Sequence, residues 1–283
     1  MKTLLKICCI ILVGGSVVHA KDVFEKEEIR KTLKFADHQG PSRVLLDNIN
    51  GSVNVVGHDG NDVELVAHKS IRAESSDKIR EAKEDVKLEI KEERDRISVV
   101  VVTPWRNENG EVHYHGYRWY GYEVTIDFEL KVPKNCMLFV KTINEGEITT
   151  KDFEGDFEIK NVNGGITMTG AAGSGKVTTV NGPVNVTFRK NPASDCRFHT
   201  VNGTVEVEFQ DMLSADFVLK TFNGKVYTDY DIVHLPRKEP TFEQGKRKKV
   251  YRSGESFAVR VREGGPELAF ETLNGDIRIL KHQ

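Results

Sequence analysis

The residues that could do chemistry gather in one segment, 105–122, whose composition differs from the rest of the chain. It holds both tryptophans and four of the seven tyrosines. Aromatic side chains with polar edges suit the stacking of sugar rings or the anchoring of a partner protein. The ligand-binding candidates are therefore Trp105, Tyr114, Tyr117, Trp119, Tyr120 and Tyr122. The alternative is that several of these rings form the core of a capping structure, with Gly116 and Gly121 in turns.

Catalytic and metal-binding patterns are weak elsewhere in the sequence. His113 and His115 place two imidazoles on one side of a strand, which is half of a metal site, but no further ligands can be assigned to it. The stretch 171–176 ends in Gly-Ser-Gly-Lys but lacks the first glycine and the Ser/Thr of a phosphate-binding loop, so we interpret it as a tight turn. The carboxylates are scattered, and no glycosidase pair can be nominated. We predict no catalytic residues, no metal and no cofactor.

Composition and the N-terminus indicate an exported protein. The chain has 283 residues, of which 38% are hydrophobic and 30% charged, and its net charge of −2 gives no footprint for nucleic acid. Lys2 and Lys6 precede an apolar run over residues 7–18, and small residues lead up to Ala20. This is the layout of a cleaved secretory signal, and the run is shorter than the ~20 residues of a membrane-spanning helix. We expect a periplasmic or extracellular protein without a transmembrane segment after cleavage.

The elements that must position these residues come from a short phrase that recurs along the chain. One copy reads Thr200-Val201-Asn202-Gly203-Thr204-Val205-Glu206-Val207, and related copies begin at positions 48, 142, 161, 179, 221 and 272. Counted from the asparagine, positions −1, +3 and +5 are mostly apolar, which predicts two strands per repeat, each with one buried face. In one copy Glu145 is inserted, which moves the apolar residue to Ile148. The predicted corners are Asn50, Asn144, Asn163, Asn181, Asn202, Asn223 and Asn274.

Two architectures fit this repeat. Asn-Gly between alternating strands is a strong hairpin signal, because both residues accept positive φ in a type I′ turn. In a parallel β-solenoid, by contrast, each repeat is one coil, Asn-Gly turns a corner, and equivalent residues stack at about 4.8 Å. Stacked asparagines can then form an amide ladder, and we expect the Thr or Asn at position −2 to stack likewise. The recurrence of the same residue types at the same positions favours the solenoid.

The sequence also resembles a known family, the secreted bacterial DUF4097 proteins that are labelled "putative adhesins". The resemblance is carried by residues 124–135, which end in a Val-Pro strand, by 142–148, by the later T-x-N-G-x-[IV] copies, and by 272–279. It covers roughly residues 44 to 280. It implies an all-β parallel solenoid with two short strands per coil of roughly 20 residues, capped by an N-terminal strand, short-helix and hairpin portion.

The predicted domain organisation follows from these patterns. We expect a signal peptide at 1–20, a leader at 21–43, an N-terminal coil and capping portion at 44–135 with an aromatic hairpin at 105–122, and solenoid repeats at 136–283 with an insertion at 229–257. A short surface helix is predicted from about Ser75 to Glu84. The gap between Asn223 and Asn274 predicts about one missing or altered coil plus the insertion. The portions 57–132 and 229–257 are expected to cover the two ends of the stack.

Cys136 and Cys196 are the only cysteines after the signal sequence. Two cysteines in an oxidising compartment usually indicate a disulfide. In the solenoid register, however, they lie three coils apart, or about 14 Å along the stack. A disulfide requires Cα atoms within about 7 Å, so we predict two unpaired thiols and no disulfide.

These observations predict a non-catalytic, exported β-solenoid that acts as an envelope-associated binding or scaffold protein. The expected partner is an envelope polysaccharide or protein, and not nucleic acid. The alternative from another functional class is a polysaccharide-active enzyme of the β-helix type.

Overall fold

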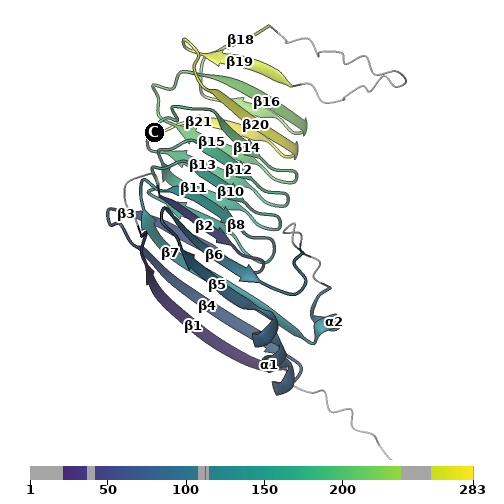
Figure 1. Ribbon diagram of the computed structural model, residues 1–283. Coiled ribbons are helices and arrows are strands. Elements are labelled where there is room, and N and C mark those ends of the chain that lie inside the picture. The colour runs from purple at the N-terminus through teal and green to yellow at the C-terminus, as the bar shows by residue number, and fades with distance from the viewer. Residues whose placement is uncertain (1–21, 37–41, 108–111, 113–114, 237–255, 283) are drawn as a thin grey trace, which may run out of the picture.

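The computed structural model describes residues 22–36, 42–107, 112, 115–236 and 256–282. The predicted signal peptide, His113, Tyr114 and most of the 229–257 insertion lie outside these residues. The described chain is all-β with two short helices, and its strands form two long sheets (Figure 1).

The first sheet has ten strands that belong to widely separated parts of the chain. Their spatial order is β1 (Val23–Leu33), β4 (Val63–Ala73), β7 (Tyr122–Pro133), β3 (Val53–His58), β9 (Ile148–Lys151), β11 (Ile166–Ala171), β13 (Val184–Phe188), β15 (Val205–Phe209), β21 (Ile277–Lys281) and β17 (Val226–Thr228).

The second sheet has eleven strands and is built from the remaining halves of the repeats. Their spatial order is β18 (Ile232–His234), β19 (Phe257–Val261), β16 (Ala215–Asn223), β20 (Glu267–Asn274), β14 (Cys196–His199), β12 (Gly175–Thr178), β10 (Phe157–Lys160), β8 (Met137–Lys141), β2 (Arg43–Asp47), β6 (Arg96–Val102) and β5 (Lys87–Glu92).

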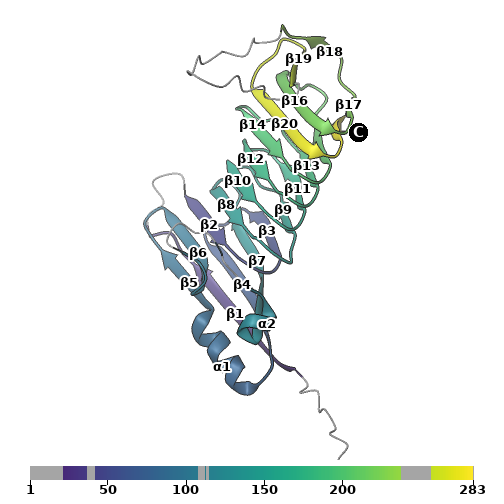
Figure 2. The same ribbon diagram turned by 90° about the vertical axis from the view of Figure 1, so that its right-hand side faces the viewer.

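Each repeat copy places one strand in each sheet. The strand before Asn181 is β12 of the second sheet, and the strand after it is β13 of the first, so the two do not pair as a hairpin. Instead, copies pair with their neighbours in parallel: Val184 lies opposite both Ile166 and Val205. Figure 2 shows the successive copies stacked one above another.

The side chains at positions +3 and +5 form the core of the stack. In the Asn202 copy, Val205 and Val207 are fully buried. Ile148 pairs with Ile166, as expected if Glu145 is an inserted residue, and Glu145 takes up the extra length with a φ of 56°. Phenylalanines stack above one another between the sheets, with ring centroids 5.0 Å apart for Phe188 and Phe209.

The expectation of one buried face on each strand is wrong at position −1. Ile49 is buried there, but Val180, Leu273 and Phe222 are exposed. The corner residue turns the chain from one sheet to the other, so the side chain just before it lies outside the core. The exposed apolar side chains at position −1 therefore form a stripe along the outer corner.

The N-terminal end contains a strand where a leader was predicted. Residues 21–43 include β1, an eleven-residue edge strand that pairs antiparallel with β4. Six of its eleven residues are charged, at positions 25–28, 30 and 31. Charged edge strands prevent pairing with other chains, but they lack the alternation by which a strand is usually detected.

The short helix was predicted correctly. Helix α1 covers Ser76–Asp85, and the side chain of Ser75 caps it by accepting the backbone N–H of Lys78 at 3.3 Å. Ile79 and Ala82 are its buried residues.

The aromatic hairpin predicted at 105–122 is absent from the described residues of that segment. They contain an isolated antiparallel bridge between Arg106 and Val112 and the four-residue helix α2 (Tyr117–Tyr120). Gly121 ends this helix with a φ of 74°, a left-handed conformation that favours glycine. The segment connects β6 to β7, which lie in different sheets.

The C-terminal end also departs from the predicted order. No altered copy fills the interval between Asn223 and Asn274 in its described residues. The chain instead adds β18 and β19 to the end of the second sheet, then returns so that β20 lies between β14 and β16. Likewise β21 lies between β15 and β17. The last copy in sequence is therefore the penultimate copy in the stack.

Candidate functional site

Three of the aromatic candidates pack inside the N-terminal end of the stack. Tyr122 is fully buried, and Trp105 and Tyr120 are half-buried against the core. The ring centroids of Trp105 and Tyr120 are 4.8 Å apart, and those of Tyr120 and Tyr122 are 5.8 Å apart. The Tyr122 hydroxyl donates a hydrogen bond to Asp85 at the end of α1. Burial and this bond raise the pKa of Tyr122 above its usual range.

Tyr117 attaches the start of the described chain to this end. Its hydroxyl donates to Asp22 at 2.6 Å, and Arg72 binds the same carboxylate at 2.7 Å. The Arg72 guanidinium carbon lies 4.6 Å from the centroid of the Tyr117 ring. The hydrogen bond to Asp22 raises the pKa of Tyr117 to about 12. The contacts of Tyr117 are therefore internal ones.

Trp119 is the candidate that the structure presents to solvent, with 74% of its surface exposed. Its ring centroid lies 5.7 Å from that of His115. Tyr114 lies outside the described residues. Of the five described candidates, Trp119 alone offers an open ring, so these five do not form a platform of several rings.

The corner asparagines form a continuous ladder of side-chain amides. Each Nδ2 donates to the Oδ1 of the copy before it in the stack, at 2.8 Å from Asn163 to Asn144, from Asn181 to Asn163 and from Asn202 to Asn181. The same pattern starts with Asn144 on Asn50 at 3.2 Å and continues with Asn274 on Asn202 and Asn223 on Asn274, both at 2.7 Å. All seven predicted corner residues therefore lie in one line.

The residues at position −2 occupy equivalent places in neighbouring copies, as expected: Thr221 lies opposite Thr272 in the parallel register. Their side-chain hydrogen bonds, however, go to backbone carbonyls and not to one another. Asn48 donates to the carbonyl of Ile126 at 2.9 Å, and the others donate to the backbone carbonyl of a glycine in the neighbouring copy, as Thr200 does to Gly182 at 2.8 Å and Asn161 to Gly146 at 2.9 Å. All of these residues except the half-buried Thr221 are buried, and the bond satisfies a polar group that would be costly to leave unpaired. They hold adjacent copies together from inside the corner.

The corner glycines are required for close approach of one copy to the next. A Cβ on Gly203 would overlap the carbonyl oxygen of Gly182, and one on Gly182 would overlap that of Gly164. Neither has a positive φ, so the type I′ argument for Asn-Gly does not apply to them. Glycine is needed because the backbones of successive copies pass in direct contact.

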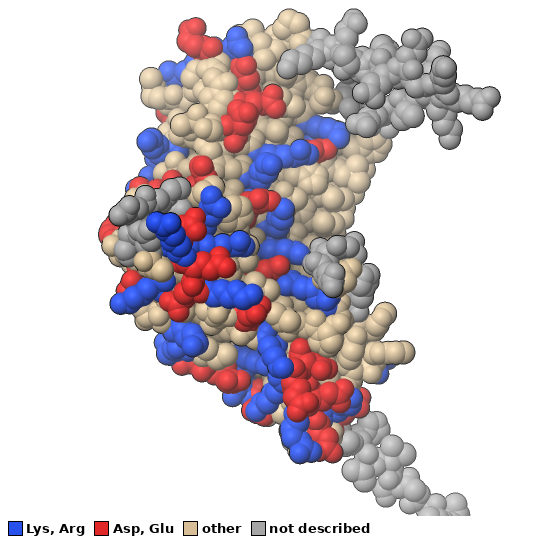
Figure 3. Space-filling model, in the orientation of Figure 1, with Lys and Arg blue, Asp and Glu red and all other residues tan. Residues whose placement is uncertain are grey.

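Exposed apolar side chains gather at the C-terminal end of the stack. Of eleven large, exposed hydrophobic residues in the described chain, seven are distributed over the last strands and turns of the stack, which we call together the C-terminal apolar surface: Met212, Phe222, Tyr227, Ile232, Val233, Phe257 and Leu273. Strands β17 and β18, which carry three of them, are edge strands of the described sheets. Figure 3 shows charged side chains crowded at the N-terminal end and broader uncharged areas toward the C-terminal end.

The C-terminal apolar surface was not predicted from the sequence, although one signal was present. Most copies have valine or isoleucine at position −1, whereas the last two have Phe222 and Leu273. Larger apolar residues at an outward corner position predict an exposed apolar surface at this end.

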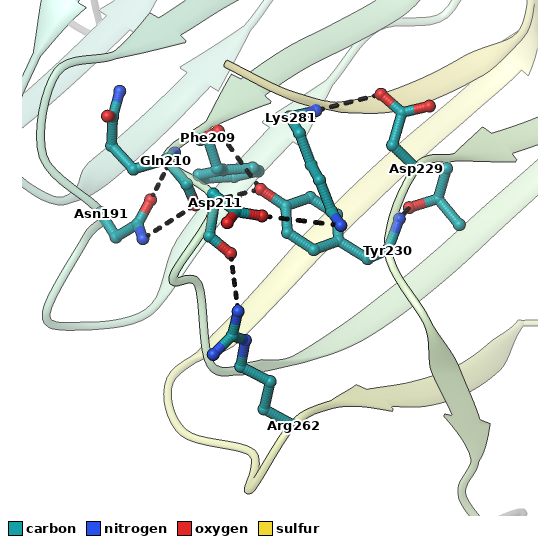
Figure 4. Close-up of polar contacts among 9 residues, drawn as sticks. Asn191, Phe209, Gln210, Asp211, Asp229, Tyr230, Arg262 and Lys281 are labelled. Carbon is teal, nitrogen blue, oxygen red and sulfur yellow. Dashed lines mark hydrogen bonds and ion pairs between the residues drawn. The ribbon is translucent and has the colours of Figure 1, made fainter. Parts of the chain in front are cut away.

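Beside this surface, a group of polar contacts joins the last strands (Figure 4). Tyr230 donates its hydroxyl to the carbonyls of Phe209 and Gln210, each at 3.2 Å. Lys281 lies 5.2 Å from the Tyr230 ring centroid and 3.6 Å from an oxygen of Asp211. Burial raises the pKa of Tyr230 to about 12. Tyr230 and Leu213 are both buried here, and the group closes the end of the core.

A polar cavity of about 380 Å³ lies at the other corner of the stack. Its lining includes His58, Asp59, Lys134, Glu154 and the buried Cys136. Lys134 binds Asp59 at 2.9 Å, and the pKa of that carboxyl is lowered by this hydrogen bond. Across the described residues, no three His, Cys, Asp or Glu side chains are grouped to hold a metal ion.

The structure places the two cysteines on different copies. Cys136 directly precedes β8 and Cys196 begins β14, and β10 and β12 lie between these strands. Both are buried thiols. Burial raises the pKa of Cys136 to about 12 and that of Cys196 to about 11.

Neither described helix has the length and apolar character needed to cross a membrane.

No family model and no curated protein matches the chain. Among solved structures, a "putative cell adhesion protein" from Clostridium sporogenes is 10% identical, with 91% of this chain and 100% of that chain covered and a TM-score of 0.46. A "putative adhesin" from Bacteroides fragilis is 9% identical, with 90% and 97% covered and a TM-score of 0.27. A "Putative lipid binding protein" from Parabacteroides distasonis is 9% identical, with 90% and 97% covered and a TM-score of 0.23.

Proposed function

We propose that this chain is an exported, non-catalytic β-solenoid of the DUF4097 type that binds a protein partner at the cell envelope. In this proposal each solenoid coil is one repeat copy with two short strands, and the stack is a rigid support. The partner docks at its C-terminal apolar surface. The observation that carries the proposal is the concentration of exposed apolar side chains at that end.

Two properties of this end support binding. Large exposed apolar patches on folded proteins mark contact surfaces, because leaving them in water is unfavourable. Edge strands offer unpaired backbone groups to an added strand. The opposite end also has edge strands, β1 and β5, but they are rich in charged residues, which discourage an added strand.

A protein partner is favoured over a polysaccharide. Sugar recognition through stacking needs open aromatic faces, and Trp119 is the single open ring among the five described aromatic candidates. Phe222 and Val233, by contrast, expose 63% and 67% of their surfaces at the C-terminal end. They are suited to the apolar core of a protein interface.

The alternative of a polysaccharide-active enzyme receives less support from the described carboxylates. Glycoside cleavage uses two carboxyl groups that flank the scissile bond. In the polar cavity Asp59 is paired with Lys134, and Glu154 is paired with Arg189 at 2.8 Å. We therefore propose that the protein binds a partner and is not an enzyme.

The test is a pull-down of the mature protein from envelope extract with matched surface variants. The double variant Phe222→Ser, Val233→Ser should lose the captured protein. Phe24→Ser changes a phenylalanine that is 67% exposed on β1 and should retain it. Equal capture by all three proteins would overturn the proposed surface.

A glycan array with wild type and Trp119→Ala tests the alternative in which the binding partner is a polysaccharide. Glycan binding that is lost in Trp119→Ala would replace the protein partner by a sugar. Absence of glycan binding, together with loss of capture in the double variant, supports the proposal.

A further inference from the structure

The repeat corners contain six Asn-Gly pairs, which is chemically notable. Asn-Gly is the dipeptide in which an asparagine side chain cyclises most readily, because glycine leaves its own backbone nitrogen unshielded. That nitrogen loses its proton and attacks Cγ of the asparagine, a C–N bond forms, and the side-chain amide leaves as ammonia. Water then opens the succinimide to aspartate or isoaspartate. The reaction requires an accessible glycine N–H and a side chain that is free to rotate.

Corners inside the stack restrict both groups. The Gly182 N–H donates to the carbonyl of Asn202 at 2.9 Å, and the Gly203 N–H donates to that of Asn274 at 3.0 Å. The Asn202 side chain donates to Asn181 and accepts from Asn274. Cyclisation of Asn202 therefore requires three hydrogen bonds to break: the one that the Gly203 N–H donates and the two that the Asn202 side chain makes.

Asn223-Gly224 differs because it belongs to the last copy of the described stack. The ladder runs in one direction, so each inner Oδ1 accepts from the next copy along, and the N–H groups of Gly51, Gly182, Gly203 and Gly275 donate to the next copy. The Asn163 pair is held through its side chain, which donates to Asn144 and accepts from Asn181. Among the described residues no repeat copy lies beyond Asn223 to accept the Gly224 N–H or to donate to the Asn223 Oδ1. Its one ladder bond is the donation to Asn274 at 2.7 Å, and both residues of the pair are exposed.

We propose that Asn223-Gly224 is the deamidation site of the folded repeat region, and that the stack protects the other repeat pairs. The protected asparagines are Asn50, Asn163, Asn181, Asn202 and Asn274. This inference rests on the hydrogen bonds of the corner and not on the proposed function.

The product would alter the end of the stack. A carboxylate at position 223 has no proton to donate to the Asn274 Oδ1, so the last ladder bond is lost and two oxygens face each other. The new negative charge also lies next to Phe222, inside the C-terminal apolar surface.

The experiment is peptide mapping by mass spectrometry of wild-type protein held at pH 8 and 37 °C, with isoaspartate scored at each Asn-Gly pair. A parallel sample in urea gives the rate for each pair without the stack. Asn109-Gly110, outside the described residues, is scored separately. In the folded sample Asn223 should react at least about tenfold faster than any other repeat pair, because each inner pair must break further hydrogen bonds first.

Two internal comparisons make the result decisive. All six pairs should react at similar rates in urea, and Asn144, which precedes Glu145, should react slowly in both samples. If an inner pair reacts as fast as Asn223 in the folded protein, the protective role of the ladder is overturned. If Asn223 stays intact over the time in which the urea sample converts, its assignment as the reactive site is overturned.

Discussion

Asn274 donates its side-chain amide to Asn202 at 2.7 Å, although Asn223 is the repeat asparagine that comes between them in the sequence. The last copy is thus inserted between two copies that precede it in the chain. The N-terminal end has the same feature, since β2 and β3 lie between the β6–β7 pair and the β8–β9 pair. The outermost repeat-like strand pair is β6–β7 at one end of the stack and β16–β17 at the other. At each end, the segment that connects this outermost pair to the pair beneath it passes over the outermost pair. An end layer therefore cannot separate without disturbing the connection to the layer beneath.

The ladder predicts unequal effects for asparagines in its middle and at its end. Asn202→Ala removes two side-chain hydrogen bonds and should lower the free energy of unfolding by about 2 kcal/mol. Asn223→Ala removes one bond, and its cost should be about half as large. Urea denaturation monitored by circular dichroism measures both. Equal costs for the two variants would show that the ladder bonds do not add along the stack.

The close approach of the corners predicts intolerance to a single methyl group. Gly203→Ala would force its Cβ against the carbonyl of Gly182, and should cost about 3 kcal/mol, the upper range for overpacking. Gly165→Ala is a matched control one position further along a corner, where the nearest atoms are 3.3 Å away on the Pro183 ring. The control should change the melting temperature little. A large loss in the control would point to glycine flexibility in place of close approach.

The buried thiols predict slow cysteine chemistry in the folded state. Because burial raises the pKa of Cys136 to about 12 and that of Cys196 to about 11, few thiolates are present at pH 8. Iodoacetamide should label neither cysteine in the native protein and both in urea. Non-reducing peptide mapping of the mature protein should recover both as free thiols. A Cys136–Cys196 disulfide would contradict the order of the strands between them.

His199 predicts a loss of stability at mildly acidic pH. Burial lowers the pKa of His199 below its ordinary value of 6.5. The positive charges of Arg197 and Lys220 lower this pKa further, whereas the negative charge of Glu271 raises it. Between its folded pKa and 6.5 the unfolded chain binds more protons than the folded chain, so stability falls as the pH decreases through this window. His199→Gln should reduce the slope of the free energy of unfolding against pH between pH 7 and 5. The pH dependence of stability below pH 5 should be unchanged. An unchanged slope in the variant would assign it to other groups.

Sequence patterns predicted the parts of the structure that depend on local spacing. The helix at Ser76–Asp85 followed from its cap and apolar face, and the corner asparagines followed from the period of the repeat. The strand β1 was missed because an edge strand need not alternate. The roles of Trp105 and Trp119 could not be separated, since both are tryptophans in one segment and only their neighbours in space make one half-buried and the other exposed.

The sequence by itself determined that this chain is built of repeats, which of their residues face inward at +3 and +5, and where each corner lies, because these follow from a period that is written in every copy. The tertiary structure alone decided the order of the copies. Every copy presents the same glycine carbonyls and asparagine amides to its neighbours, so any copy can stack on any other, and the sequence of Asn202, Asn274 and Asn223 along the ladder depends on the path that the connecting segment takes. The same path leaves Phe222 and Val233 exposed at one end, where we propose that the protein binds its partner.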